Sequence, residues 1–423
     1  MPPPPSAASR DETVIRDGAD ACPGALRLHA ADDGYLARVR LPAGRLTARQ
    51  AGLLGRAAAR LGDGHLDLTS RGNVQLRGLA AGCGGDLAAL LDEAGLLPAP
   101  GHERVRNIVA GPLSGLEGPD RPDVQPWARE FDRLLCADAR AAGLSGRFLF
   151  AFDDGRGDVA ALAPDVTVLA VPRPPAGDGA AGPAAAGGGR ALVRLGAADE
   201  AAEVPAAAAA RAALLAAGYF LDAAGAAGTK AWRVAELPSE HALDAVEFTR
   251  RLAAAGIPAT RVAGPAWPVG APPRPGQVGA GDRPALCALV PLGRLGPEQW
   301  AALAEAAERC AGPLRLTPWR SVVLPGAPDD AAALLARSGL VVAPGSPWEA
   351  VTACTGRPGC AKSLADVRAD ARAAAGGVPG RPGRAVLPVH WSGCERRCGH
   401  PRGTGWLDVV ATASGYEVAD RTP

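Results

Sequence analysis

Two stretches of the chain repeat one pattern. They read LDLTSRGNVQLRG over residues 66–78 and LRLTPWRSVVLPG over residues 314–326. Both centre on a Leu-Thr pair, and the valine, leucine and final glycine that follow fall in the same register. Apolar residues that recur at every second position indicate a β-strand with one face in a core. The recurrence predicts a chain built from two copies of one module.

The flanking sequence extends the repeat from Leu36 to Gly78 and from Cys287 to Gly326. Each copy begins with apolar strand positions and continues into an Ala/Leu-rich stretch of helical length, and Thr47 is the expected N-cap of the first of these. A second strand, expected at 66–76 in the first copy, leads into a short amphipathic stretch. This order predicts an α+β module of the ferredoxin-like kind. Two generic αβ modules that merely look alike are the alternative.

A weaker second repeat follows each module. RNIVAGPLSG at 106–115 stands where VTACTGRPG stands at 351–359, and FLFAFDDG at 148–155 stands where VLPVHWSG stands at 386–393. The second copy carries cysteines in or beside these stretches, and the first copy does not. One gene duplication would therefore give two pseudo-equivalent halves with a single metal centre.

The nine cysteines divide into two groups. Five stand singly, and for most of them a small buried apolar residue is the simpler interpretation. These are Cys22, Cys83, Cys136, Cys287 and Cys310. The other four form the pairs Cys354/Cys360 and Cys394/Cys398, in loops rich in glycine and proline. Four thiolates from two loops are the ligands that a [4Fe–4S] cluster needs. A Cys₄ zinc site is the rival, although five residues between paired cysteines are unusual for zinc.

Composition limits the possible partners. The 45 basic and 44 acidic side chains give a net charge of +1, so no global field favours nucleic acid or a membrane surface. Lys230 and Lys362 are the only lysines, so anion sites must be built from arginine. The N-terminus has no signal-peptide pattern, and the best apolar stretch, 201–218, is interrupted by Glu203, Pro205 and Arg211. We expect a cytoplasmic protein, where cysteines more often bind metals than form disulfides.

The length of 423 residues predicts several domains. Pro/Gly/Ala-rich composition marks 173–190 as a loop and 264–284 as a linker. The expected domains are a ferredoxin-like half-domain at 22–98, an αβ domain without cluster cysteines at 99–263, the linker, a second half-domain at 285–345, and a cluster domain at 346–423.

With its cysteine pairs, the duplicated pattern resembles the sirohaem-dependent nitrite and sulfite reductases. This resemblance covers nearly the whole chain. It implies two ferredoxin-like half-domains and two larger αβ domains around a central tetrapyrrole pocket, with the cluster on Cys354, Cys360, Cys394 and Cys398. It also implies a set of residues that bind the carboxylates of the tetrapyrrole. They are Arg71, Asn73, Gln75, Arg106, Asn107, Arg147 and Arg320.

One departure from the family affects the expected substrate. The reductases carry a basic residue on both sides of the phenylalanine that is Phe148 here, and this chain has Leu149 on the second side. Loss of a charge weakens any site that stabilises a developing anion. A reductase of nitrite or sulfite with bound sirohaem is therefore the second expectation, and a non-catalytic Cys₄ metal-binding protein is the third.

The first expectation comes from one branch of the family. Ala21-Cys22-Pro23-Gly24, the stretch 317–320 and the stretch 389–394 resemble the branch that acts on precorrin-3A in aerobic cobalamin (vitamin B12) biosynthesis. That resemblance implies O₂-dependent hydroxylation of a ring carbon with lactone formation. It also implies a mononuclear non-haem iron and an outside electron donor, either a ferredoxin or an NADH-linked reductase. The sequence assigns no catalytic residue and no ligands for that iron.

Overall fold

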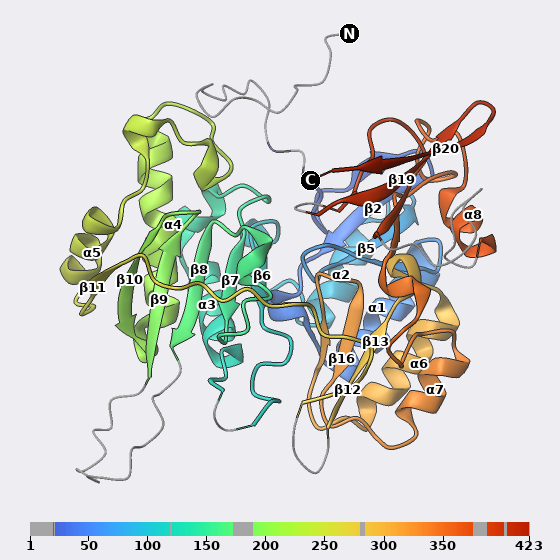
Figure 1. Ribbon diagram of the computed structural model, residues 1–423, viewed down its shortest axis with the longest axis horizontal. Helices are drawn as coiled ribbons and strands as arrows, with labels where there is room; N and C mark the ends of the chain where they lie inside the picture. Colours follow the sequence, from blue (N-terminus) through green and yellow to red (C-terminus); the bar gives the residue numbers. More distant parts are fainter. Residues whose placement is uncertain are drawn as a thin grey trace. The chain divides into compact units, whose positions relative to one another are not determined.

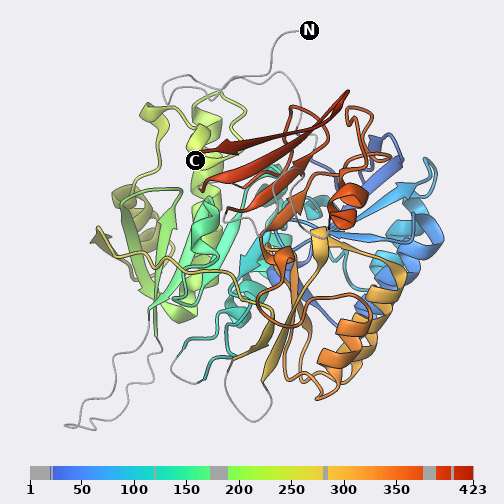
Figure 2. The same ribbon diagram turned by 45° about the vertical axis from the view of Figure 1, so that its right-hand side comes forward.

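The computed structural model describes residues 20, 22–118, 121–171, 189–279, 284–374, 387–401 and 404–422 (Figures 1 and 2). The N-terminal residues before 20, nearly all of the Pro/Gly/Ala-rich stretch 173–190, and residues 280–283 of the expected linker lie outside them. Two compact units make up the chain. The first comprises Pro98–Pro272 with Arg40–Ala43 and the N-terminal residues to Cys22, and the second comprises Pro23–Val39, Gly44–Leu97 and Pro273–Pro423.

Two five-stranded sheets in the second unit correspond to the duplicated sequence. The first sheet has the order β1 (His29–Ala31), β2 (Gly34–Val39), β5 (Val74–Leu79), β4 (Leu66–Leu68) and β14 (Arg294–Leu295). The second has the order β12 (Gly276–Val278), β13 (Ala285–Leu289), β16 (Ser321–Leu324), β15 (Leu314–Leu316) and β3 (Arg45–Leu46). The stretch expected as a linker contains strand β12. Its residues form a strand because they pair with β13.

Each sheet takes its last strand from the other repeat. β14 pairs antiparallel with β4, and β3 pairs antiparallel with β15. The exchanged leucines, Leu46 and Leu295, are fully buried. Neither sheet is therefore complete without the other.

Four helices accompany the two sheets. They are α1 (Ala48–Leu61), α2 (Gly84–Glu93), α6 (Pro297–Glu308) and α7 (Ala331–Arg337). Thr47 caps α1 as expected, since its hydroxyl accepts from the backbone N–H of Gln50. The indole of Trp300 on α6 packs on Gly55 of α1 and donates to the carbonyl of Ala51 at 2.8 Å. The helices of the two repeats thus pack together.

The expected single strand at 66–76 is a hairpin, because a tight turn separates β4 from β5. The hydroxyl of Thr69 accepts from the backbone N–H of Asn73 at 3.1 Å, and Gly72 has a left-handed φ of 66°. Thr317 makes the equivalent bond to Ser321 at 3.3 Å. There the left-handed position is occupied by Arg320, with a φ of 60°. A threonine-anchored turn with a left-handed residue reverses the chain in both repeats.

In the first unit, one six-stranded sheet carries helices α3 (Gln125–Ala137), α4 (Ala209–Ala226) and α5 (Ala245–Ala254). The strand order is β11 (Thr260–Ala263), β10 (Glu200–Pro205), β9 (Arg190–Leu195), β8 (Val166–Val171), β7 (Phe150–Asp153) and β6 (Ile108–Ala110). Five phenylalanines form much of its core. They are Phe131, Phe148, Phe150, Phe152 and Phe220.

Helix α4 consists mostly of alanine and leucine. Among the described residues, Ala206–Ala226 is the one helix long and apolar enough to cross a membrane by length and composition. Eight residues of α4 are buried, and the helix contacts α3 and three strands of the sheet. These contacts are those of a core helix of this unit.

The second unit also holds a four-stranded sheet with α8 (Val367–Ala373). Its order is β17 (Val351–Ala353), β18 (Val389–Ser392), β19 (Trp406–Thr412) and β20 (Gly415–Arg421). β17 and β18 are parallel, as are β6 and β7 of the first unit. The backbone N–H of Cys354 donates to Trp391 at 2.9 Å, and that of Gly111 donates to Phe152 at 3.0 Å. The two pairs of strands are equivalent, with a register one residue away from that expected for 148–155 and 386–393.

The strand exchange makes a testable prediction at Gly44, next to β3. Its φ is +65°, and a Cβ there would collide with the carbonyl oxygen of Leu316. We expect Gly44→Ala to destabilise the second unit by about 2–4 kcal/mol, measured as a lower midpoint of urea unfolding. Gly85→Ala is the control, since nothing lies within 4 Å of a Cβ on that α2 residue. Equal midpoints for the two variants would contradict the exchanged packing.

Candidate functional site

The four clustered cysteines lie in loops at one edge of the four-stranded sheet. Cys354 directly follows β17, and Cys394 follows β18 by two residues. Because these strands are parallel neighbours, their carboxyl ends meet at the same edge of the sheet. Cys360 and Cys398 continue the same two loops. The topology therefore explains how cysteines so far apart in sequence come together.

The other three thiols of the set affect the ionisation of Cys398. The pKa of Cys398 is raised first by burial and then by the charges of Cys354, Cys394 and Cys360, while Arg396 opposes the rise. Cys398 is exposed and the other three are half-buried. Within the described ranges, no three His, Cys, Asp or Glu side chains form a group that could hold one metal ion.

The loops supply donors and close backbone packing suited to a sulfur-ligated cluster. The backbone N–H of Gly393 donates to the sulfur of Cys354 at 3.2 Å. A Cβ at Gly393 would collide with the hydroxyl of Ser363, and Gly356 and Gly399 have φ of 71° and 88°. Iron–sulfur clusters are held by thiolates whose sulfurs accept N–H hydrogen bonds, so the residues present fit a [4Fe–4S] cluster.

A buried carboxylate supports the second cysteine loop. Asp408 on β19 is 1% exposed and accepts from Arg397 at 2.5 Å and from Arg421 at 3.0 Å. Arg397 lies between Cys394 and Cys398 and has a left-handed φ of 48°. The pair of Arg397 with Asp408, on the neighbouring strand, holds the loop of Cys394 and Cys398 in this conformation. No local sequence pattern marks that pairing, and the sequence interpretation missed it.

His390 and His400 flank this loop. His390 is fully buried on β18, and its Nδ1 lies 2.8 Å from the hydroxyl of Thr352. Burial, followed by the charge of Arg320 and by His400, lowers the pKa of His390 to about 4. The ring of His400 stacks on Trp406 with centroids 4.7 Å apart. Both rings therefore lie in packed positions beside the second cysteine loop.

Of the residues expected to bind a tetrapyrrole, Arg71, Asn73, Gln75 and Arg320 belong to the second unit. Arg71 is half-buried in the Thr69 turn, Asn73 is buried beside it, and the side-chain oxygen of Gln75 accepts from Arg38 at 3.1 Å. Arg320 lies in the equivalent turn of the other repeat. The structure thus places arginine on the same turn in both repeats.

Arg320 differs from the other arginines of the expected set. Its side chain packs against Gly293, and burial, together with repulsion from Arg368, lowers its pKa to about 10. In the described part of the chain, its guanidinium has neither a hydrogen bond nor an ion pair. A non-glycine residue at a φ of 60° is also conformationally costly. A strained, partly desolvated cation without a counter-ion favours a role in binding an anion.

Arg106, Asn107 and Arg147 belong to the first unit. Arg106 is 5% exposed and forms two hydrogen bonds of 2.7 Å with the carboxylate of Asp132. The amide of Asn107 donates to the carbonyl of Gly146 at 2.6 Å. This bond connects the segment of Arg106 with the segment of Arg147. Arg147 is exposed and lies 4.8 Å from the ring centroid of Trp232. The charge of Arg106 is therefore already neutralised by a carboxylate.

The first unit carries carboxylates where the second carries cysteines. The loop after β7 contains Asp154 and Asp158, both 1% exposed, and the Asp154 carboxylate packs on Gly111, the counterpart of Cys354. Arg156 donates to Glu117 and to Asp158. Burial and the charge of Asp153 raise the pKa of Asp154 to about 6 and that of Asp158 to about 7. Carboxylates and an arginine thus stand in the first unit where the second unit has its cysteine loops.

These raised pKa values predict a pH-dependent stability. Between about pH 4 and 7 the folded chain keeps a proton at Asp158 that the unfolded chain has released, so the free energy of unfolding falls as pH rises. Asp158→Asn removes this titration. We expect the free energy of unfolding of Asp158→Asn, minus that of the natural protein, to increase with pH through that window and to level off above it. Urea unfolding at several pH values measures this difference. Parallel pH profiles for the two proteins would contradict the assignment.

The chain thus has duplicated αβ modules with exchanged strands and, at one edge of a sheet, four cysteines that fit an iron–sulfur cluster. The family model of the nitrite/sulfite reductase ferredoxin-like half domain matches the chain twice, at residues 29–94 and 279–338. These two matches contain every strand of the two exchanged sheets except β12. The chain therefore contains two ferredoxin-like half domains of the nitrite/sulfite reductase kind.

Sequence relatives match parts of the chain, and a solved structure shares its fold. A precorrin-3B synthase from Sinorhizobium sp is 32% identical over 160 residues, 38% of this chain and 34% of the relative. A ferredoxin–nitrite reductase from Leptolyngbya laminosa is 32% identical over 24% of this chain and 20% of the relative. The structure of the Mycobacterium tuberculosis NirA protein has a TM-score of 0.66 at 19% identity, over 96% of this chain and 77% of the other. The matched part spans about a third or less of these curated relatives.

Proposed function

We propose that this protein is a precorrin-3B synthase, a monooxygenase of aerobic cobalamin biosynthesis that acts in the cytoplasm. In this reaction O₂ delivers one oxygen atom to a ring carbon of precorrin-3A, and the other leaves as water. Two electrons and two protons balance the reaction, and the electrons come from an outside donor, a ferredoxin or an NADH-linked reductase. An acetate side chain of the substrate closes the lactone.

The observation that carries this choice is the position of Leu149. It is 4% exposed in the core of the first unit, and its backbone N–H donates to Asp165 at 2.8 Å. The resemblance gives the reductases a basic residue at this position. A buried leucine provides no cation for an inorganic anion, and relocating a charge there would carry a large desolvation cost. This favours a substrate whose reacting centre is larger and less charged.

Binding of the substrate is assigned to arginines of the second unit. Tetrapyrroles of this pathway carry several carboxylates, and guanidinium groups pair with carboxylates through two parallel hydrogen bonds. Among the described residues no carboxylate pairs with Arg320, and Arg71 lies on the equivalent turn. Asn73 and Gln75 support the turn of Arg71. Arg106, Asn107 and Arg147 lie in the first unit. That they bind the tetrapyrrole stays a prediction.

The cluster would be held by Cys354, Cys360, Cys394 and Cys398, with Gly393 donating to a ligand sulfur. When bound, it supplies one-electron transfer. The mononuclear non-haem iron implied by the resemblance does not fit as well, since the described residues contain no group of three ligating side chains for one ion.

A sirohaem-dependent nitrite or sulfite reductase is the second candidate. The relatives named as ferredoxin–nitrite reductases and the likeness of fold to NirA favour it. The buried Leu149 argues against it. A zinc protein with a Cys₄ site is the remaining candidate, and metal analysis separates all three.

Metal and sulfide analysis tests the cluster. We expect protein purified without oxygen to contain about four irons and four sulfides, with broad charge-transfer absorption and no sharp haem bands. Cys394→Ala should lose most of the iron and sulfide, whereas Cys310→Ala should keep them. Sharp haem-like bands would instead indicate sirohaem, and zinc without sulfide would exclude both enzymes. Turnover of precorrin-3A under O₂ then tests the reaction itself.

Arg320→Gly separates substrate binding from folding. Because Gly72 holds the equivalent left-handed position, glycine at 320 should leave stability unchanged or slightly higher. Loss of a charge-assisted hydrogen bond should weaken binding of uroporphyrin, a stable polycarboxylate tetrapyrrole, about ten- to hundredfold in absorbance titrations. Arg309→Ala, which removes an arginine paired with Asp330 on the same repeat, is the control. Equal affinities for the two variants would exclude Arg320 from the binding site.

A further inference from the structure

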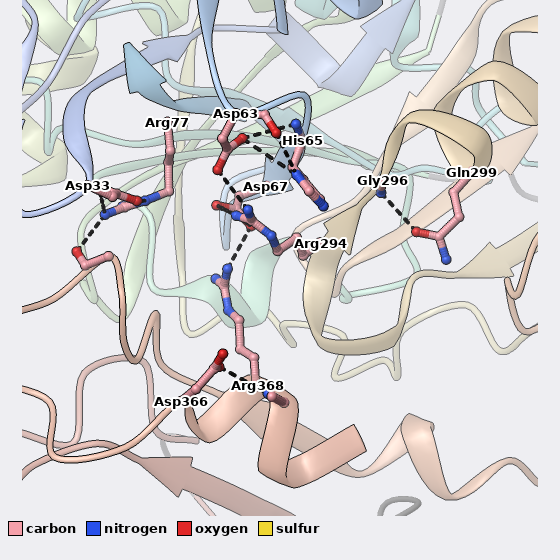
Figure 3. Close-up of polar contacts among 12 residues, drawn as sticks. Asp33, Asp63, His65, Asp67, Arg77, Arg294, Gly296, Gln299, Asp366 and Arg368 are labelled. Carbon is pink, nitrogen blue, oxygen red and sulfur yellow. Dashed lines mark hydrogen bonds and ion pairs between the residues drawn. The ribbon is translucent and has the colours of Figure 1, made fainter. Parts of the chain in front are cut away.

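The side chain of Arg77 connects the first repeat to the cysteine loop. Arg77 lies on β5 and is 4% exposed. It donates to both carboxylate oxygens of Asp33 at 2.8 and 2.9 Å, as Figure 3 shows, and its Nη2 also donates to the carbonyl of Gly359 at 2.7 Å. Gly359 immediately precedes Cys360. A buried arginine with this many satisfied donors fixes the groups that it contacts.

Residues on the other side of Cys360 are held from the same turn. Asp32, next to Asp33 in the turn between β1 and β2, accepts a hydrogen bond from the backbone N–H of Ala361. A Cβ at Gly359 would lie 2.8 Å from the carboxylate of Asp33, so the loop fits closely against this turn. The backbone of Cys360 is thus fixed on both sides by residues of the first repeat.

We propose that Asp32, Asp33 and Arg77 form a clamp that positions Cys360 as a cluster ligand. This inference rests on the proposed cluster. Groups that orient metal ligands through hydrogen bonds commonly alter metal retention when they are removed. The clamp acts on the backbone beside the ligand, so these are positioning residues. They make cluster retention depend on a repeat that contributes no cysteine ligand.

A neighbouring network provides a matched control. Arg368 on α8 donates to Asp67 on β4 at 3.0 Å, and Asp67 also pairs with Arg294, as Figure 3 shows. This network connects the same sheet to α8, and the side chain of Arg368 is 14% exposed against 5% for Arg77. It contacts none of the residues from 354 to 361 through a hydrogen bond or ion pair in the described structure. Arg368→Met therefore removes a comparable ion pair without touching the cysteine loop.

The first measurement is retention of iron and sulfide in Arg77→Met, Arg368→Met and the natural protein during exposure to air. We expect Arg77→Met to lose its visible absorption about tenfold faster or more, as for other groups that orient metal ligands, and Arg368→Met to follow the natural protein. Asp32→Ala, an exposed substitution that removes one contact of the clamp, should show a smaller acceleration in the same direction. Equal rates in Arg77→Met and Arg368→Met would overturn the proposal.

A second measurement is independent of the identity of the metal. The only lysines are Lys230 in the first unit and Lys362 beside the clamp, so a lysine-specific protease reports on two separate places. In metal-free protein, Arg77→Met should be cleaved several-fold faster after Lys362 and at the natural rate after Lys230. Unchanged cleavage after Lys362 would overturn the clamp. If the natural protein holds no iron or sulfide, the proposed function fails, and this digestion still decides whether the clamp exists.

Discussion

The exchange of β3 and β14 between the two sheets is the constraint on which the second unit depends. Leu46 and Leu295 are buried in the sheet of the other repeat, so neither repeat has a complete core alone. The exchange also brings Arg294 of β14 to Asp63 and Asp67 of the first repeat. Asp67 in turn accepts from Arg368 on α8. The pairing of β14 with β4 is thus connected, through Arg294 and Asp67, to helix α8 beside the cysteine loops.

Duplication provides a symmetric backbone, and function arises where the side chains differ. Gly72 and Arg320 occupy the same left-handed position of equivalent turns. Gly111 and Cys354 make the same backbone hydrogen bond at the ends of equivalent strands. In each comparison one copy has glycine and the other a side chain that can bind a ligand.

The sequence predicts local features well and distant pairings poorly. The repeat, the Thr47 cap and the cysteine loops follow from short patterns, because each depends on neighbours along the chain. The hairpin within 66–76 was missed, since a strand pattern continues through a turn whose anchor is a threonine hydroxyl. The strand β12 in the expected linker, and the bond from Arg77 to Gly359, depend on partners far away in sequence. Periodicity carries no information about such partners.

Neutralisation of charge distinguishes arginines that the sequence treats alike. Arg106 forms a two-bond pair with Asp132 in a buried place, so breaking it for a ligand would leave Asp132 unpaired at a cost of several kcal/mol. Arg294 and Arg368 already share Asp67. Arg320 has no such partner in the described structure, and repulsion by Arg368 makes its charge more costly still. An anionic ligand would relieve that cost at Arg320 without breaking an existing pair. Of these four arginines, Arg320 is therefore the one that could pair with a carboxylate of a ligand without losing a partner of its own.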